Sequence, residues 1–174
     1  NIMEEMNQEV QQKSAGQVVF RFYAGGVAGD ERDVLRKMRI QQLHGGAFSG
    51  FGLGEILSDI RVLELPLLFR NAVEAEHVAS KMVAHFTTAF AQKGYALLSL
   101  NESGAVYIFS KDPLRTREDL ARAKLWTWQG DPLPQAIFKA YGVTPVPLSL
   151  PNVLPSLQSG LIDACYATPL SVLA

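Results

Sequence analysis

The chain has 174 residues, of which 48% are hydrophobic and 19% are charged, and its formal net charge is −1. These values are typical of a globular protein with one domain or two small ones, long enough to bury a core. A near-neutral chain lacks the basic face that a nucleic acid or an anionic membrane surface requires, so both are excluded as partners. No apolar run in the sequence reaches the ~18 residues of a membrane-spanning helix.

The first third of the chain is expected to alternate helices and strands. Apolar residues recur at helical spacing over residues 2–10, and Asp30 with Asp33 forms a capping box that begins a second helix. Runs of β-branched, aromatic and small residues predict strands at 17–23 and 45–49. The strand–helix–strand order indicates a βαβ unit with parallel pairing.

A glycine-rich stretch, GFGLG at residues 50–54, suggests a phosphate-binding loop but fails the test for one. The dinucleotide fingerprint needs a third glycine, and the places where it could stand hold Glu55 and Leu57. We interpret the stretch as a flexible loop that contains an aromatic residue. Such a loop suits the lining of a cleft, and it suits a plain surface loop nearly as well.

The rest of the chain is expected to contain one long helix and then a regular alternation of strands and helices. Apolar residues four apart from Val78 to Phe90 predict the long helix, which ends at Gly94. A capping box formed by Thr116 and Asp119 predicts a short helix. Further strands are predicted at 96–100, 105–110, 125–128, 145–148 and 162–167, with helices at 131–141 and 151–158.

Both tryptophans of the chain lie in the strand predicted at 125–128. Trp126 and Trp128 alternate with Thr127, so both should point to the same face of a sheet. Asp131 follows as an expected helix N-cap, before a proline in the first turn. Because open α/β sheets bind ligands where a strand ends at the start of a helix, we expect this strand to form one wall of a binding cleft.

The sequence offers no catalytic or metal-binding pattern. Its His, Cys, Asp and Glu residues do not show metal-ligand spacing, and most acidic residues stand at helix starts, where capping explains them. The single cysteine, Cys165, cannot form an internal disulfide and is expected to be buried and inert. We therefore expect a protein that is not an enzyme and that has neither cofactor nor metal.

Several stretches together, in one order, carry a family resemblance. They are FYAGG at 22–26, GDER at 29–32, LELPLLFR at 63–70, EDL at 118–120 with KL at 124–125, GVTPVPL at 142–148 and LQSGLID at 157–163. In this order they resemble the extracytoplasmic substrate-binding proteins of TRAP transporters, of the dicarboxylate-receptor type. Each stretch alone is weak, but the ordered set spans nearly the whole chain.

The resemblance implies a two-lobed α/β protein, like the periplasmic binding proteins, with mixed, mostly parallel sheets. Its lobes would close about a hinge on a small-molecule ligand and deliver it to TRAP membrane permease subunits. The location implied is periplasmic, or extracytoplasmic with a lipid anchor. Family members are longer, so we expect a fragment: residues 1–123 in lobe I without its first strand, and 124–174 in lobe II without its C-terminal part.

The chain departs from the family where the ligand's carboxylate is held. The arginine that the family usually carries on the strand after the Asp-Leu segment is replaced by Trp126. A second family arginine would fall near Ala105 or Val106, and the acidic-Asn pair is replaced by the residues at 166–168. An indole cannot clamp a carboxylate, so we expect an atypical subgroup with an apolar or aromatic-compatible ligand.

The candidate ligand-binding residues therefore come from strand ends and loops. They are Trp126, Trp128, Gln129, Tyr166, Thr168, Phe48, Ser49, Phe51 and, near the hinge, Glu102. Three alternatives stay open: an organic acid bound without the arginine clamp, a cationic ligand stacked on the tryptophans with Glu102 or Asp131 supplying charge, and a protein-interaction component with a vestigial cleft. An α/β enzyme would need a nucleophile or base that the sequence does not propose.

Overall fold

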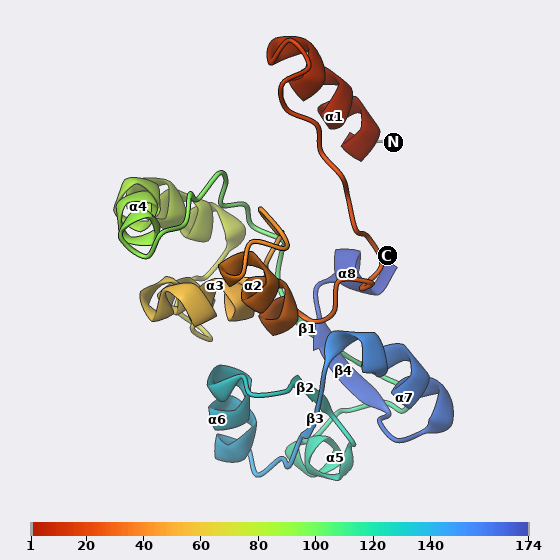
Figure 1. Ribbon diagram of the computed structural model, residues 1–174. Helices are drawn as coiled ribbons and strands as arrows, with labels where there is room; N and C mark the ends of the chain where they lie inside the picture. Colours follow the sequence, from red (N-terminus) through yellow and green to blue (C-terminus); the bar gives the residue numbers. More distant parts are fainter. Residues whose placement is uncertain (1, 174) are drawn as a thin grey trace.

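The computed structural model describes residues 2–173, apart from the side chain of residue 170, and it has the expected mixed α/β architecture (Figure 1). In chain order the elements are α1 (Ile2–Lys13), α2 (Glu31–Arg39), α3 (Gly50–Ile56), the 3-10 helix η1 (Ser58–Glu64), α4 (Ala72–Gln92), β1 (Tyr107–Ser110), α5 (Arg117–Arg122), β2 (Trp126–Trp128), α6 (Pro132–Ala140), β3 (Val146–Leu148), the 3-10 helix η2 (Leu150–Asn152), α7 (Val153–Ser159), β4 (Ala164–Ala167) and α8 (Pro169–Leu173). The fold class predicted from the sequence is confirmed.

Four short strands form two two-stranded sheets. β2 and β3 are parallel, with Trp126 opposite Val146, whereas β1 and β4 are antiparallel. An isolated parallel bridge between Leu125 and Ala164 brings the two pairs together. β1 precedes residue 124 and β4 follows it, so this pair crosses the boundary predicted between the two lobes. That boundary stays a prediction.

Helix starts and ends follow the local sequence closely. Asp30 and Thr116 each close the capping box that the sequence predicts, at the starts of α2 and α5. The Asp131 carboxylate accepts a hydrogen bond from the Leu133 backbone N–H and caps α6, with Pro132 in the first turn. Gly160 ends α7 in the left-handed conformation, at a φ of 76°. These signals act within one turn of helix, which is why the sequence alone locates them.

Three predicted strands are absent from the described residues. Residues 17–23, 45–49 and 96–100 contain no strand and belong to neither strand pair. Val19 and Leu98 are 62% and 92% exposed. β-branched and aromatic residues favour extended backbone, but a strand also needs a neighbour for its N–H and C=O groups, and no local pattern supplies one.

The glycine-rich stretch is a helix, so the loop predicted at 50–54 is wrong. Ser49 caps α3 by accepting a hydrogen bond from the Phe51 backbone N–H. A side chain at Gly50 or Gly52 would collide with the carboxylates of Glu64 and Glu31, which lie against the first turn of the helix. The glycines therefore make room for charged side chains, and this contact outweighs their low helix propensity.

The buried apolar residues form two clusters. Ile60, Phe86 and Phe90 pack η1 against α4, and a second cluster joins Leu125 and Ala164 with residues of α6 and the turn after it. By contrast, α1 buries no residue and projects away from the other helices in Figure 1. Among residues 2–173 none of the helices combines the length and apolar character needed to cross a bilayer.

Replacing Phe86 by alanine is expected to lower the free energy of unfolding by ~3–5 kcal/mol. The ring is fully buried between Ile60 and Phe90, so its loss leaves a cavity in the first cluster. Urea unfolding would measure the change, with Val83→Ala, at an exposed position of α4, as the control. Equal effects of the two substitutions would show that this cluster is not a core.

Candidate ligand-binding site

Aromatic side chains from α3, β2, β4 and α6 form a continuous row. The distance between ring centroids is 5.6 Å for Phe51 and Trp128, and 5.2 Å for Trp128 and Trp126. It is 5.4 Å for Trp126 and Tyr166, and 5.6 Å for Tyr166 and Phe138, which ends the row. Four of these five rings belong to the residues that the sequence proposes as a ligand site. We call the five residues the aromatic row.

Trp126 and Trp128 differ in how much surface they leave free. Trp126 is 4% exposed, stacks on Tyr166, and its indole N–H donates a hydrogen bond of 3.0 Å to the Leu148 carbonyl. Trp128 is half-buried and lies between Trp126 and Phe51. In this arrangement Trp126 fixes the row to β3, and Trp128 is the tryptophan with surface left for a ligand.

Tyr166 contributes a neutral hydroxyl next to the row. Burial raises the pKa of this phenol, so it stays protonated in the physiological range. Its hydroxyl lies near the Thr127 side chain and the Trp128 backbone N–H, but it reaches full hydrogen-bond geometry with no described residue, and the same holds for the Thr127 hydroxyl. Buried hydroxyls without a settled partner are able to bond a ligand or a water.

A buried ion pair joins η1 to the end of the aromatic row. Arg61 Nη2 lies 3.0 Å from Asp131 Oδ2, and the two side chains are 17% and 3% exposed. Arg61 Nε lies 2.7 Å from Glu64 Oε2, in an ion pair that lacks the direction of a hydrogen bond. Asp131 thus neutralises Arg61 and caps α6 at the same time, which fixes the end of β2 against η1.

Glu31 connects α2 to the start of α3. Its carboxylate accepts hydrogen bonds from the Ser49 N–H at 2.8 Å, the Ser49 hydroxyl at 3.0 Å and the Gly52 N–H at 2.7 Å. Burial nevertheless raises the pKa of Glu31, because desolvation outweighs these hydrogen bonds. Ser49, proposed from the sequence as a ligand contact, is engaged here in capping α3 and binding Glu31, and the half-buried Phe48 ring lies over Gly52.

Arg32 also borders the row, although it is not among the ligand contacts predicted from the sequence. Its guanidinium carbon lies 5.1 Å from the Phe51 ring centroid, and its Nη2 donates to Glu55 at 2.8 Å and to the Gly130 carbonyl at 3.3 Å. Its neighbours in the sequence are acidic, a pattern that is typical of a solvated helix face with mixed charges. Only the packing of α2 against α3 and against the end of β2 reveals its neighbours.

The remaining predicted residues lie apart from these contacts. Gln129 is exposed and uses its backbone N–H to bond the Leu148 carbonyl. Thr168 is buried, and its hydroxyl bonds the Ser171 hydroxyl and N–H, as a cap of α8. Glu102 is exposed in the segment before β1. Their roles as ligand contacts stay predictions.

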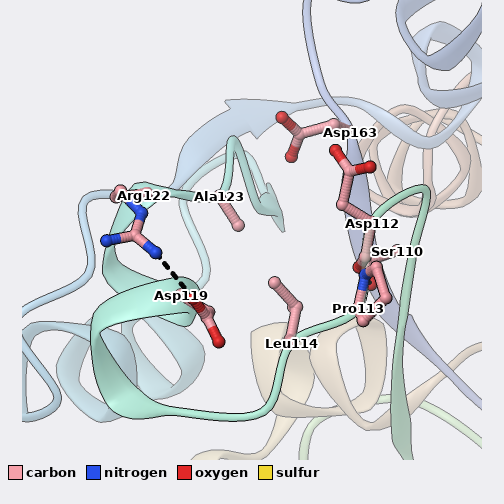
Figure 2. A pocket seen from close by; sticks show the side chains of 8 residues that line it. All are labelled: Ser110, Asp112, Pro113, Leu114, Asp119, Arg122, Ala123 and Asp163. Carbon is pink, nitrogen blue, oxygen red and sulfur yellow. Dashed lines mark hydrogen bonds and ion pairs between the residues drawn. The ribbon is translucent and has the colours of Figure 1, made fainter.

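Two hollows of the surface do not include the aromatic row. One, of about 170 Å³, contains carboxylates and the ion pair between Asp119 and Arg122 (Figure 2). Its lining residues are Ser110, Asp112, Pro113, Leu114, Asp119, Arg122, Ala123 and Asp163. The other, of about 430 Å³, is lined by Thr127, Gln135, Lys139, Val143, Thr144, Pro145 and Pro147. In the described part of the chain no three His, Cys, Asp or Glu side chains are arranged to hold a metal ion.

Residues 1–173 match the family described as bacterial extracellular solute-binding protein, family 7. The chain belongs to this family. It is 28% identical over 163 residues to a solute-binding protein of Chromohalobacter salexigens, covering 92% of this chain and 48% of that one. It is 25% identical to the 2,3-diketo-L-gulonate-binding periplasmic protein YiaO of Escherichia coli, covering 91% and 48%.

A solved structure shows the same fold. A TRAP periplasmic solute-binding protein of Chromohalobacter salexigens with bound D-glucuronate is 26% identical to the chain and superimposes with a TM-score of 0.84, covering 94% of this chain and 55% of that one. The chain therefore spans about half the length of the relatives it matches. The resemblance to TRAP solute-binding proteins is confirmed, and the family is one of binding proteins rather than enzymes.

Replacing Asp131 by asparagine is expected to lower the free energy of unfolding by ~1–3 kcal/mol. Asparagine still caps a helix, so the loss reports mainly on the buried pair with Arg61. Thermal and urea unfolding would measure the change. Glu9→Gln, which breaks the exposed pair with Lys13, is the control and should leave the midpoint unchanged. A similarly small effect at Asp131 would contradict a structural role for the pair.

The raised pKa of Glu31 predicts a pH-dependent contribution to stability. The folded state binds the Glu31 proton more tightly than the unfolded state, whose glutamates titrate near pH ~4.3. The contribution of Glu31 to the free energy of unfolding is therefore largest below the pKa of the unfolded state. It declines as the pH rises from that value through the higher pKa of the folded state. Unfolding free energies measured from pH 4 to 7 should fall less steeply in Glu31→Gln than in the unchanged protein. An identical slope in both would refute the prediction.

Proposed function

We propose that this protein is the extracytoplasmic solute-binding receptor of a TRAP-type transporter and captures a small organic acid beside the aromatic row. The observation that carries the proposal is the row itself, because it places Phe51 of α3 against Trp128 at the end of β2. Family membership supports a binding role. Binding at the end of a strand, where a helix begins, follows the general rule for open α/β sheets.

The row suits a small ligand that has both apolar and polar faces. An indole ring packs on the C–H face of a sugar-like molecule, while nearby hydroxyls and N–H groups orient its oxygens. Trp128 offers a half-buried ring, and the Tyr166 hydroxyl lies near the Trp128 backbone N–H without a settled partner. These groups would supply stacking and a few hydrogen bonds.

Among the ligand classes that the sequence leaves open, we favour an organic acid held without the family's usual arginine clamp. The relative of known structure is bound to D-glucuronate, and YiaO is described as binding 2,3-diketo-L-gulonate; both ligands are sugar acids. An apolar ligand, expected from the replacement of that arginine by Trp126, has no counterpart in these relatives. The tryptophan would then contribute a packing surface, and the negative charge would be met by another residue.

Capture would use closure of two parts of the chain on the ligand. Arg61 with Asp131, Arg32 with Gly130, and Phe51 with Trp128 connect the helices before α4 to the end of β2. We assign these contacts to a closed arrangement, in which the aromatic row is covered. TRAP permease subunits in the membrane would receive the ligand, and the protein would act in the periplasm.

Replacing Trp128 by alanine is expected to weaken D-glucuronate binding about tenfold, because it removes the half-buried ring on which the ligand would pack. Isothermal titration calorimetry with the full-length protein would measure the affinity. Tyr141→Ala, which removes an exposed ring at the end of α6, is the control. If both variants bind as the unchanged protein does, the row is not the site; if the unchanged protein binds no organic acid, the proposed ligand class is wrong.

A further inference from the structure

Arg32 lies where a cation could meet a ligand on the aromatic row. Its guanidinium packs over the Phe51 ring, and Phe51 contacts Trp128, the half-buried tryptophan. On its other side it lies against Gly130, two residues beyond Trp128, so closely that a side chain at this position would collide with it. Gly130 also has a φ of 85°, which suits glycine. The chain thus leaves room for a guanidinium at the end of β2.

Arg32 keeps unused hydrogen-bonding capacity. Its side chain is 47% exposed, and within residues 2–173 its hydrogen bonds to Glu55 and to the Gly130 carbonyl both come from Nη2. A guanidinium carries five N–H donors in a planar fork that matches a carboxylate. Within residues 2–173 neither Nε nor Nη1 makes a hydrogen bond, and Nη1 lies against Gly130, so Nε is the donor most open to a ligand while the guanidinium stays packed on Phe51.

Arg61, the other arginine near the row, does not have this freedom. It is 17% exposed, and it is engaged by Asp131 on one nitrogen and Glu64 on another. A ligand carboxylate brought to Arg61 would meet these two negative charges at close range. By comparison, Arg32 forms an ion pair with Glu55 alone in the described chain, and this pair is partly open to solvent. Asp30 and Asp131 act on Arg32 from beyond ion-pair distance.

We infer that Arg32 binds the ligand's carboxylate, in place of the arginine that Trp126 replaces, while its guanidinium stays packed over Phe51. The inference rests on the proposed function and assigns its ligand an anionic group. Because Glu55 also competes for the same cation, it sets how strongly an anion is preferred over a neutral ligand of the same shape. Trp128 and Arg32 would then contact the two sides of one molecule, its C–H face and its carboxylate.

A pair of matched ligands tests the inference: D-glucuronate and its neutral amide, D-glucuronamide. Calorimetry with the full-length protein is expected to show that Arg32→Gln binds D-glucuronate at least tenfold more weakly, while its affinity for the amide changes little. Arg36→Gln is the control, because Arg36 lies on the same helix and pairs with Asp33 on the exposed surface. It should leave both affinities unchanged.

A second variant separates ligand binding from a structural role of the pair. Glu55→Gln removes the competing charge, so it should raise the affinity for D-glucuronate and not for the amide; a purely structural pair would lower both. If the unchanged protein binds D-glucuronate and Arg32→Gln binds it equally well, the inference is wrong and the proposed function stands. If the unchanged protein binds neither these probes nor other small organic acids, the proposed function fails and the inference fails with it.

Discussion

The pair between Arg61 and Asp131 is the interaction on which the site depends. The Asp131 carboxylate is almost completely buried, and a buried charge is tolerated only next to an opposite charge or several donors. Asp131 has both, since Arg61 neutralises it and the Leu133 N–H donates to it. This pair fixes the start of α6 against η1. The end of β2, which immediately precedes α6, is thereby held against α3 and α2, and the aromatic row follows from that position.

Charged side chains also explain the glycine-rich helix α3. Carboxylates of Glu64 and Glu31 lie over Gly50 and Gly52, and the Arg61 side chain lies over Gly54. Three glycines at alternate positions thus allow three long charged side chains to approach one short helix. The stretch has the composition of a phosphate-binding loop because close approach to a charged group requires glycine in both cases. Here the charged groups belong to the protein.

Trp126 lies in the middle of the aromatic row, buried and hydrogen-bonded to the Leu148 carbonyl. The resemblance in sequence predicts that it stands where related proteins carry an arginine. A large aromatic residue at this position extends the apolar surface between β2 and β4. In our proposal the cation has moved to α2, on the other side of Trp128, and the same class of ligand is bound from a different direction.

Features that depend on neighbours within one helical turn or one strand can be predicted from the amino-acid sequence. The capping boxes at Asp30 and Thr116, the N-cap at Asp131, the glycine that ends α7 and the aromatic residues on β2 were all predicted because their signals are local. The family and the fold class were also predicted, from stretches that occur in a fixed order along the chain.

Tertiary structure alone decided which extended segments become strands, that residues 50–56 form a helix, and which charges border the site. Val19 and Leu98 lie in segments with strand-like composition, yet those segments find no partner in the described chain. Arg32 and Gly130 are 98 residues apart in the sequence, and Arg61 and Asp131 are 70 apart. Contacts over such separations depend on how whole helices pack, and no spacing within a single element encodes them.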